Sequence, residues 1–455
     1  MNNQSLEDVL ASVGNPVKLL RNSQIGPYAF PVVRPEFSNW RDEQRAWKET
    51  CALLDQSHHM TDLYVEGPDA LKLLSDLGVN SFKNFRVNQA KQFTACNHNG
   101  HVIGDVILFY LDTNKFNLVG RPPACNWVQY HVEKGRYNAT AVRDERSADN
   151  RGHRRTFRYQ VQGPHALRVM EKVTGKPAPD IRFFNMDTMT IAGHSVRALR
   201  HGMVGQPGWE LFGPWEDAEE VRSAILEGGR DFGIRQVGSR AYPTTCLESG
   251  WIPSPLPAIY TGEEMKEYRK WLKATSYEAK ASLGGSFYSD NIADYYLTPY
   301  DLGYGPFVKF DHEFVGRQAL EKIDQSRRKK VTLVWNKDDV KAAWGTQFDE
   351  GDTAKYIDLP LANYSTLPFD KVLKDGKTVG VSTYTGYTYN ERVMLSLGVV
   401  DCQYSEVGTG VAIVWGEENG GSPKPTVERH RQTTIRATVA SVPYAETARV
   451  AYRPQ

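Results

Sequence analysis

One local pattern occurs twice in this sequence and restricts the possible folds more than any other feature. Residues 62–66 favour a strand, Gly67-Pro68 interrupts it, and residues 69–74 favour a helix. The same order returns over residues 158–170, around Gly163-Pro164. Glycine permits unusual backbone angles and proline lacks an N–H donor, so the pair ends a regular element. The repeat predicts two strand-turn-helix units, from an internal duplication or a pseudo-symmetric pairing of subdomains.

Short strand patterns fill most of the first 326 residues. Strands are predicted at residues 92–96, 106–110 and 115–119. A turn is expected at 97–100, and a glycine-rich turn after Gly202 leads into a strand that carries Glu210. The charged run 143–155 is predicted to be a solvated loop. With the helices, this predicts an α+β module of two intertwined subdomains over residues 1–326.

A second region follows the basic link at residues 327–330. Strand patterns at 331–335 and 410–415 predict a small β-barrel or sandwich, assigned to residues 327–455 and expected to cover the first module. A second glycine-rich element, Leu283-Gly-Gly-Ser286, precedes it.

Two helices are predicted near the start of the chain. The first covers residues 5–21, with Ser5 as N-cap and Gly14 near the stop. The second passes through Trp40 and Trp47 and ends near Asp55.

Composition excludes several classes of function. Lys plus Arg (55) nearly cancels Asp plus Glu (54), so no overall field attracts nucleic acid or an anionic membrane. The first residues are polar and acidic, unlike a signal peptide, and no segment is long enough to span a bilayer. The five scattered cysteines are interpreted as reduced packing thiols of a cytoplasmic protein: Cys51, Cys96, Cys125, Cys246 and Cys402.

The adjacent histidines His58 and His59 do not indicate a metal site. Successive side chains of a strand point to opposite faces, and no third His or Cys stands nearby at a ligand-like spacing. No metal is expected, and one histidine of the pair is expected to face a pocket.

Residues 238–256 are candidates for a pocket wall. Tyr242, Glu248 and Trp251 stand close together in sequence among prolines and glycines that restrict the backbone. The alternative is an ordinary buried loop, because Tyr and Trp usually lie in the core or at its rim. Glu210 is likewise open to two interpretations, a solvated face of a strand or a buried ligand-binding carboxylate, and the residues alone favour the solvated face.

The order of several short motifs resembles the aminomethyltransferase superfamily, which includes the T-protein of glycine cleavage. The matching strings are Leu54-Asp-Gln-Ser-His-His-Met60, Val65-Glu-Gly-Pro-Asp-Ala70, Gln162-Gly-Pro164, Gly205-Gln-Pro-Gly-Trp-Glu210, Leu247-Glu-Ser-Gly250 and Phe314-Val-Gly-Arg317. Within the superfamily the chain is most similar to tetrahydrofolate-dependent aryl O-demethylases. That similarity includes Gly238-Ser-Arg-Ala-Tyr-Pro243, Tyr304-Gly-Pro-Phe-Val-Lys-Phe-Asp-His312 and Trp415-Gly-Glu-Glu-Asn-Gly-Gly421. It implies a folate-cradling module and transfer of an aryl methyl group to N5 of tetrahydrofolate.

Two departures from the T-protein pattern bear on the reaction. T-proteins carry paired aspartates where this chain has Gly104-Asp105, and an arginine where it has Tyr242. Glycine offers no side chain to accept a proton, and the group over the reacting centre becomes a phenol. Both changes weaken the case for an aminomethyl donor and favour an aromatic ether.

The resemblance implies roles for the residues around the aromatic substrate. Tyr242 is expected to act as a general acid or polarising donor, because a phenol with a pKa of about 10 matches the departing phenol. His59 is expected to hydrogen-bond a ring substituent or to orient Tyr242, with a purely structural histidine as the alternative. Arg121 is expected to bind the substrate carboxylate, with a structural salt bridge as the alternative.

The resemblance also implies a folate site. Glu210 matches the carboxylate that grips the pterin, whose two adjacent N–H donors suit a bidentate pair. Gln160 and Trp251 are expected to line the same site through an amide hydrogen bond and an aromatic face.

Phe30 is expected to border the substrate. The vanillate and syringate enzymes have Tyr-Pro where this chain has Phe30-Pro31, so a less hydroxylated ring, such as the chlorinated methoxybenzoate dicamba, joins the lignin-derived acids as a candidate.

An aminomethyltransferase or sulfonium demethylase of the same fold is the alternative enzyme. A folate-binding accessory protein is disfavoured because residues 253–262 lack its cysteine. The partners expected are the aromatic acid and tetrahydrofolate, with the oligomeric state open.

Overall fold

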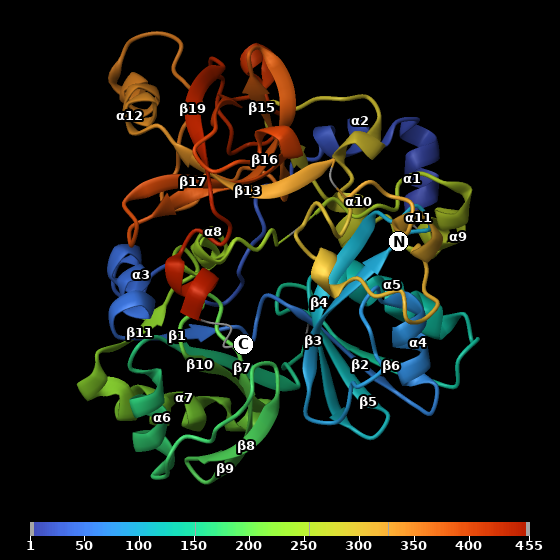
Figure 1. Ribbon diagram of the computed structural model, residues 1–455, viewed down its shortest axis with the longest axis vertical. Helices are drawn as coiled ribbons and strands as arrows, with labels where there is room; N and C mark the ends of the chain where they lie inside the picture. Colours follow the sequence, from blue (N-terminus) through green and yellow to red (C-terminus); the bar gives the residue numbers. More distant parts are fainter. Residues whose placement is uncertain (1–3, 151, 254, 326, 452–455) are drawn as a thin grey trace.

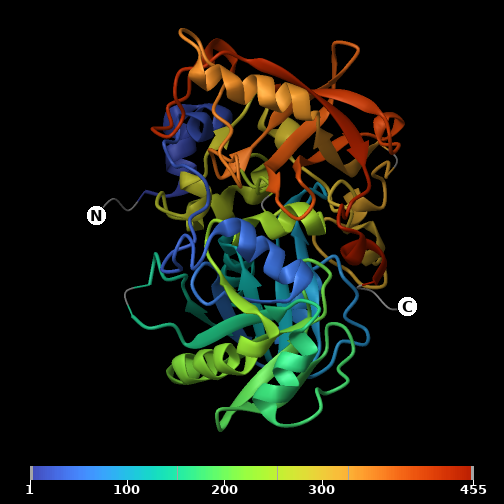
Figure 2. The same ribbon diagram turned by 90° about the vertical axis from the view of Figure 1, so that its left-hand side faces the viewer.

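The computed structural model describes residues 4–150, 152–253, 255–325 and 327–451. Two open β-sheets lie next to each other, and a closed barrel sits above them (Figure 1). The turned view keeps this order, with the barrel over both sheets (Figure 2). The two sheets contact each other directly, since the rings of Phe109 and Phe212 are 5.3 Å apart. The predicted α+β class with a C-terminal barrel is confirmed.

The first sheet has five strands in the order β3-β4-β5-β2-β6. Their bounds are β2 Thr61–Glu66, β3 Ala90–Cys96, β4 Val102–Asp112, β5 Lys115–Gly120 and β6 Thr140–Asp144. All the pairings are antiparallel. The predicted strands at 92–96, 106–110 and 115–119 lie in β3, β4 and β5.

The second sheet has six strands in the order β11-β1-β7-β10-β9-β8. Their bounds are β1 Cys51–Asp55, β7 Thr156–Gln162, β8 Met186–Ile191, β9 His194–Arg200, β10 Gly208–Pro214 and β11 Ile234–Val237. Strand β1 lies between β11, which it pairs in parallel, and β7, which it pairs antiparallel. Side chains on one face pack against α6 and α7 in a separate apolar core.

The predicted repeat is visible in the backbone. Strand β2 leads through Gly67 into α4, and β7 leads through Gly163 into α6, with glycine φ angles of 136° and 135°. A Cβ at Gly67 would lie 2.5 Å from the carbonyl oxygen of Asn138, and one at Gly163 would lie 2.6 Å from that of Thr50. Both turns therefore need glycine for the same two reasons: the φ angle is positive, and a backbone carbonyl oxygen lies too close for a Cβ.

The helices are α1 Leu6–Val13, α2 Pro16–Asn22, α3 Trp40–Glu49, α4 Ala70–Leu77, α5 Pro122–Glu133, α6 Ala166–Thr174, α7 Ala218–Gly229, α8 Thr245–Ser249, α9 Lys266–Trp271, α10 Tyr277–Lys280, α11 Arg317–Leu320 and α12 Lys337–Gly345. Ser5 caps α1 as predicted, but the single helix over 5–21 is wrong. Gly14 ends α1 at φ 77° and Asn15 caps a new helix, because its side chain accepts the N–H groups of Val17 and Lys18.

Two further predictions are corrected. The helix through Trp47 ends at Glu49 rather than near Asp55, because the apolar run 51–54 is buried as a strand between two partners. The run 143–155 is not simply a solvated loop. It begins at the end of β6, and Arg154 is buried with ion pairs to Asp62 and Asp144; residue 151 lies outside the described residues.

The barrel closes in the order β13-β17-β16-β15-β18-β19. Its strands are β13 Arg328–Trp335, β15 Asp370–Lys374, β16 Lys377–Thr388, β17 Val393–Asp401, β18 Gly410–Trp415 and β19 Thr433–Ala440, and the short β14 Leu367–Pro368 pairs with β12 Leu283–Gly284. One apolar core runs from the five-stranded sheet into the barrel through Tyr384 and Leu397. The division of the chain at 326/327 stays a prediction.

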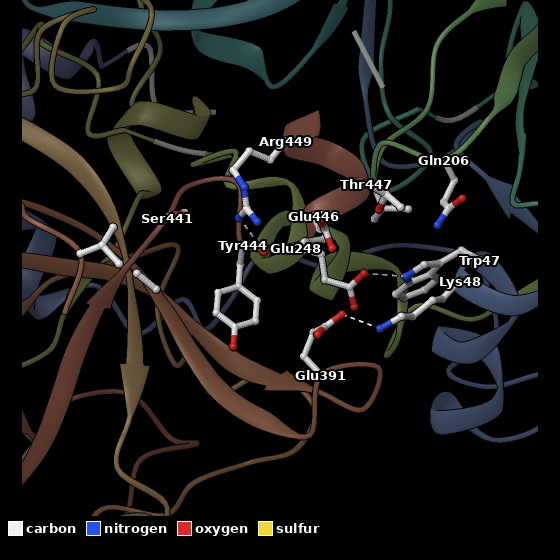
Figure 3. Close-up of a pocket in the computed structure, with 14 residues that line it drawn as sticks. Trp47, Lys48, Gln206, Glu248, Glu391, Ser441, Tyr444, Glu446, Thr447 and Arg449 are labelled. Carbon is white, nitrogen blue, oxygen red and sulfur yellow. Dashed lines mark hydrogen bonds and ion pairs between the residues drawn. The ribbon is translucent and has the colours of Figure 1, made fainter. Parts of the chain in front are cut away.

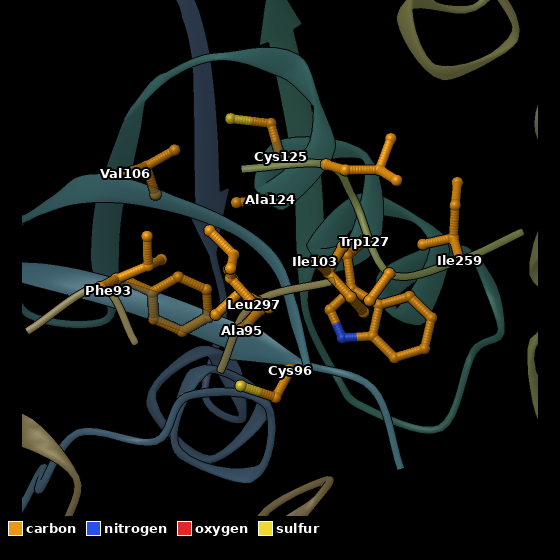
Figure 4. Close-up of a cluster of buried hydrophobic side chains, with 14 of the residues drawn as sticks. Phe93, Ala95, Cys96, Ile103, Val106, Ala124, Cys125, Trp127, Ile259 and Leu297 are labelled. Carbon is orange, nitrogen blue, oxygen red and sulfur yellow. The ribbon is translucent and has the colours of Figure 1, made fainter. Parts of the chain in front are cut away.

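The thiols pack as expected. Figure 4 shows Cys96 and Cys125 among Phe93, Ile103 and Trp127 in the main core. All five cysteines are free, and only Cys402 is partly exposed. Within the described ranges, no helix is long and apolar enough to cross a membrane. The cytoplasmic location stays a prediction.

Candidate functional site

Three aromatic side chains from separate segments meet in one cluster. Phe30 comes from the extended segment before α3, His59 from the turn after β1, and Tyr242 from the short 3₁₀ helix Tyr242–Thr244. The ring centroids are 4.7 Å apart for Phe30 and His59, 5.1 Å for Phe30 and Tyr242, and 4.9 Å for His59 and Tyr242. His59 and Tyr242 are each 7% exposed. Three of the four predicted substrate-side residues are thus brought together.

Tyr242 is held as a hydrogen-bond donor. Its hydroxyl accepts a bond of 3.2 Å from Nε2 of Gln56, which leaves the phenolic proton for another acceptor. Burial raises the pKa of Tyr242 well above its ordinary value, although the Gln56 bond acts in the opposite direction. The phenol is therefore protonated at neutral pH, and it is a weaker acid than the free phenol that the sequence argument assumed.

His59 is held neutral. Burial and, to a smaller extent, the charge of Arg121 lower the pKa of His59 to about 3. Nδ1 of His59 is buried and has no hydrogen-bond partner among the described residues. Its backbone oxygen accepts a hydrogen bond from the hydroxyl of Tyr28, which fixes the turn. A neutral imidazole with a free ring nitrogen can bind a substituent but cannot supply a proton from an imidazolium.

Arg121 lies beside this cluster among phenol rings. It precedes α5, and its Cζ lies 4.0 Å from the ring centroid of Tyr28. Burial lowers the pKa of Arg121, but Tyr277, Tyr28 and Tyr384 raise it by more. The pKa of Arg121 is therefore higher than its ordinary value. Within the described ranges no carboxylate pairs with Arg121, so the structural salt bridge considered from the sequence does not form. An unpaired guanidinium in such surroundings suits an external carboxylate.

Glu210 is buried rather than solvated, so the interpretation that the residues alone favoured is wrong. It is 4% exposed on β10, and its Oε1 lies 2.5 Å from Nη1 of Arg158 on the neighbouring β7. Arg158 also contacts Asp62, which Arg154 contacts in turn. This buried network joins the two sheets and fixes the orientation of the Glu210 carboxylate.

Two glutamines on β7 lie near Glu210 and have polar atoms without partners. Gln160 stands opposite Glu210 in the sheet register, and its Nε2 donates to the backbone oxygen of His201 at 2.7 Å. Oε1 of Gln160 and Nε2 of Gln162 are buried with no partner among the described residues. Buried amide atoms are usually satisfied, so these two suit a ligand with both donors and acceptors, as a pterin has.

Gly104 is set by the approach of a helix. A Cβ at Gly104 would lie 2.9 Å from the backbone nitrogen of Ala124 in the first turn of α5. The neighbouring Asp105 is buried and accepts hydrogen bonds from Gln92, Tyr304 and Trp251, at 2.7, 3.1 and 3.2 Å. Burial raises the pKa of Asp105, and these bonds lower it, with a net increase. Position 104 therefore has no room for the second aspartate of the T-protein pattern.

The stretch 238–256 does not form one pocket wall, although Tyr242 and Glu248 are buried and Trp251 is half-buried; residue 254 lies outside the described residues. Tyr242 faces Phe30 and His59, and Trp251 bonds to Asp105. Glu248 lines a different cavity of about 470 Å³, between α3, the loop before β10 and the segment after β19 (Figure 3). Its carboxylate is satisfied by Trp47, Thr388 and Asn390, so it pins α8 to α3 and to the barrel.

Three site residues were missed from the sequence. Gln56 stands inside a quoted motif, but nothing in the motif indicates that its amide meets Tyr242. Tyr28 stands two residues before Phe30 in the same aromatic segment. Tyr384 comes from the barrel, where it donates to the backbone oxygen of Pro243 at 3.1 Å and lies close enough to Arg121 to affect its pKa. The barrel therefore supplies a residue of the site rather than only covering it.

The fold and these motifs define a folate-type module, and residues 21–254 match the family described as the GCVT N-terminal domain. The chain belongs to this family. It is 51% identical over 451 residues to syringate O-demethylase of Sphingobium sp. (strain NBRC 103272 / SYK-6), covering 99% of this chain and 98% of that protein. It is 30% identical over 433 residues to sesamin methylene transferase of Sinomonas sp. (strain No.22), covering 91% of each.

A solved structure shares the fold. The aminomethyltransferase T of the glycine cleavage system from Bartonella henselae superimposes with a TM-score of 0.60 at 18% identity, over 91% of each chain. The resemblance drawn from the motifs, to the aminomethyltransferase superfamily and to its aryl O-demethylases, is confirmed. Within the described ranges, no group of three His, Cys, Asp or Glu side chains is placed to hold a metal ion.

Proposed function

We propose that this protein is a tetrahydrofolate-dependent O-demethylase that acts on a methoxybenzoate. The observation that carries the proposal is Arg121, a guanidinium with no carboxylate partner in the described chain, next to an aromatic cluster that contains a protonated phenol. A substrate that combines a carboxylate, an aromatic ring and an ether oxygen complements these three features. The 51% identity to syringate O-demethylase supports the same reaction class.

The roles on the folate side follow from the buried atoms around β7 and β10. Tetrahydrofolate would supply the secondary amine that takes up the methyl group. Glu210, oriented by Arg158, would accept the N–H donors of the pterin through its carboxylate. Gln160 would accept a hydrogen bond through Oε1, which has no partner in the described chain. Trp251, which donates to Asp105 on β4, would contribute an aromatic face.

On the substrate side, Tyr242 would donate a hydrogen bond to the leaving oxygen. Because burial raises its pKa, complete proton transfer to a phenolate is less favourable than hydrogen bonding, so Tyr242 acts mainly as a polarising donor. Arg121 would fix the carboxylate, and His59 would bind a ring substituent through its free nitrogen. Such fixed contacts hold the methyl carbon and its ether oxygen in line for attack.

The substrate preference follows from Phe30. Its ring packs against both His59 and Tyr242, so a tyrosine at this position would add a hydroxyl group to the aromatic cluster. The absence of this hydroxyl in Phe30 favours a substrate ring with fewer hydroxyl groups, including a chlorinated methoxybenzoate, alongside syringate-type acids. A cytoplasmic location, with only small-molecule partners, is part of the proposal.

The test is incubation with tetrahydrofolate and a panel of methoxybenzoates. Formation of 5-methyltetrahydrofolate together with the free phenol is expected, and no turnover of any aromatic ether would contradict the proposal. Turnover of an aminomethyl or sulfonium donor instead would favour the alternative enzyme of the same fold. The missing aspartate at position 104 argues against that alternative.

A further inference from the structure

A second cavity, of about 630 Å³, is lined in part by Tyr28, whose ring also contacts Phe30 of the aromatic cluster. Its walls come from residues 25–29, the side of α5 that carries Asn126 and Glu133, the segment 143–149 and residues 271–281. It contains none of Phe30, His59 and Tyr242 and is therefore distinct from the candidate site.

One side chain contacts both the cavity and the aromatic cluster. Tyr28 lines the cavity, and its ring also lies 5.8 Å from Phe30 and beneath Arg121. Its hydroxyl is tied to the backbone oxygen of His59. Tyr277 lines the cavity too, packs 6.3 Å from Tyr28, and has a buried hydroxyl with no partner among the described residues. A molecule in the cavity is one phenol ring away from Arg121.

The cavity carries cationic groups with unused donors. Cζ of Arg146 lies 5.2 Å from the centroid of the Tyr28 ring, so Arg146 and Arg121 contact the same ring. Arg146 pairs with Asp149 through Nε, and within the described ranges its two terminal nitrogens have no carboxylate partner. Lys273 and Lys280 also line the cavity without an ion pair in the described chain. The acids are occupied: Glu145 pairs with Arg143, and Glu133 accepts the indole N–H of Trp271.

We propose that this cavity is an outer binding site for the aromatic carboxylate, from which it passes Tyr28 to reach Arg121. Arg146 makes the first contact with the carboxylate, and Trp271 and Tyr277 face the ring. Two guanidinium groups next to one phenol let the anion exchange one cation for the next without a fully unpaired stage. The inference rests on the proposed function, because it takes its ligand from it.

The experiment measures binding rates rather than turnover. Syringate is mixed with the full-length protein, without tetrahydrofolate, in a stopped-flow instrument, and tryptophan fluorescence follows the association. Arg146→Gln should lower the association rate constant roughly three- to tenfold at low ionic strength, with the difference shrinking as salt is added. The dissociation rate constant should fall by nearly the same factor, because a contact on the route cancels in the equilibrium constant.

Two comparisons make the result specific. Arg222→Gln is the matched control, since Arg222 is another partly exposed arginine that pairs with a carboxylate three residues away, and its rates should not change. The neutral amide of syringate should associate equally fast with wild-type protein and Arg146→Gln. Tyr28→Phe removes the bond to His59 and should raise both rate constants together.

The outcomes separate the two proposals. Unchanged syringate rates in Arg146→Gln, or slower binding of tetrahydrofolate with syringate unaffected, would overturn the outer site, and the latter would assign the cavity to the folate tail. A weaker equilibrium affinity with an unchanged association rate would also overturn it, because Arg146 would then belong to the final site. Rates that behave as expected in a protein that turns over no methoxybenzoate would overturn the proposed function and leave the outer site standing.

Discussion

Two regions of this molecule bury charged groups, and they differ in how those groups are satisfied. Where the barrel meets Leu283-Gly-Gly-Ser286, Glu417 pairs with Lys355 at 2.8 Å and accepts the amide of Gly285 at 2.9 Å. Asp370 accepts the amide of Ser286 at 2.9 Å, and Lys424 donates to the backbone oxygen of Leu283 at 2.8 Å. We call this group the barrel clasp. Around Tyr242, in contrast, Arg121 contacts the Tyr28 ring but has no carboxylate partner in the described chain, and Nδ1 of His59 has no hydrogen-bond partner there.

The difference separates structure from function. Buried charges are retained when they are paired or hydrogen-bonded, as in the barrel clasp, where Glu417 pairs with Lys355 and where Asp370 and Lys424 each bond to the backbone. Buried polar groups without partners cost stability and persist where a ligand satisfies them. We therefore expect mutations in the clasp to affect folding first and mutations around Tyr242 to affect catalysis first.

The largest effect is expected for Tyr242→Phe. The ring and its contacts with Phe30 and His59 remain, but the only donor assigned to the leaving oxygen is lost. We expect kcat to fall about a hundred- to ten-thousand-fold, with a small change in substrate affinity and in Tm.

The dependence on the substrate sharpens this prediction. Rings with more acidic phenols, such as chlorinated ones, are better leaving groups and need less help, so the loss in kcat should be smaller for them. Near-normal kcat across methoxybenzoates of different phenol acidity would make Tyr242 a packing residue. Mutations around Tyr242 would then no longer differ from those in the barrel clasp by affecting catalysis first.

Glu417→Gln tests the expectation that mutations in the barrel clasp affect folding first. Removing the charge leaves Lys355 buried and unpaired, so the free energy of unfolding should fall by about 3–5 kcal/mol in chemical denaturation. Glu267→Gln, in an exposed pair with Lys270, should leave it nearly unchanged. The folded fraction of Glu417→Gln should keep wild-type kcat. A selective loss of kcat with stability intact would show that the clasp takes part in the reaction.

Glu210→Gln lies between the two cases, because Glu210 is paired with Arg158 and is also assigned to the pterin. Calorimetry should show tetrahydrofolate affinity weakened by about 1.5–3 kcal/mol, the range for a hydrogen bond to a charged group, and aromatic acid affinity nearly unchanged. Thermal unfolding serves as the control for the lost ion pair. Equal weakening of both ligands would mean that Glu210 acts only through the network between the sheets.

The sequence predicts the repeated units and the barrel because each depends on local signals. Gly67 and Gly163 mark turns that only glycine fits, and alternation or apolar runs mark the strands. The run 51–54 was assigned to a helix because four apolar residues after a helical pattern carry no period of their own. Pairing with β11 and β7 decides its structure, and that information lies more than a hundred residues away.

The site is predictable only where a residue type has a chemical role within a motif. Tyr242, His59 and Arg121 could be named in this way, and the fold does bring them close to one another. Gln56 and Tyr384 could not be named, because an amide and a buried phenol are common packing residues and their partners lie on other elements. The burial of Glu210 and Arg154 was missed for the same reason, since each is compensated by a charge on a different strand or segment.

The smallest effect is expected from pH, through Asp370 in the barrel clasp. Burial raises the pKa of Asp370 to about 6, while an aspartate in the unfolded chain titrates near about 4. Between these values the folded protein binds more protons than the unfolded one, so this group stabilises the fold below about pH 4 and loses that contribution as the pH rises through about 6.

Asp370→Asn keeps the acceptor for the Ser286 amide but cannot titrate. Subtracting its unfolding free energy from that of the wild type at each pH should give a difference that declines by up to about 1.4 kcal/mol per pH unit across this window and is flat above it. A flat difference from pH 4 to 7 would mean that Lys355 and Arg21 keep Asp370 ionised, so that the clasp is a fully charged network at every pH at which the enzyme works.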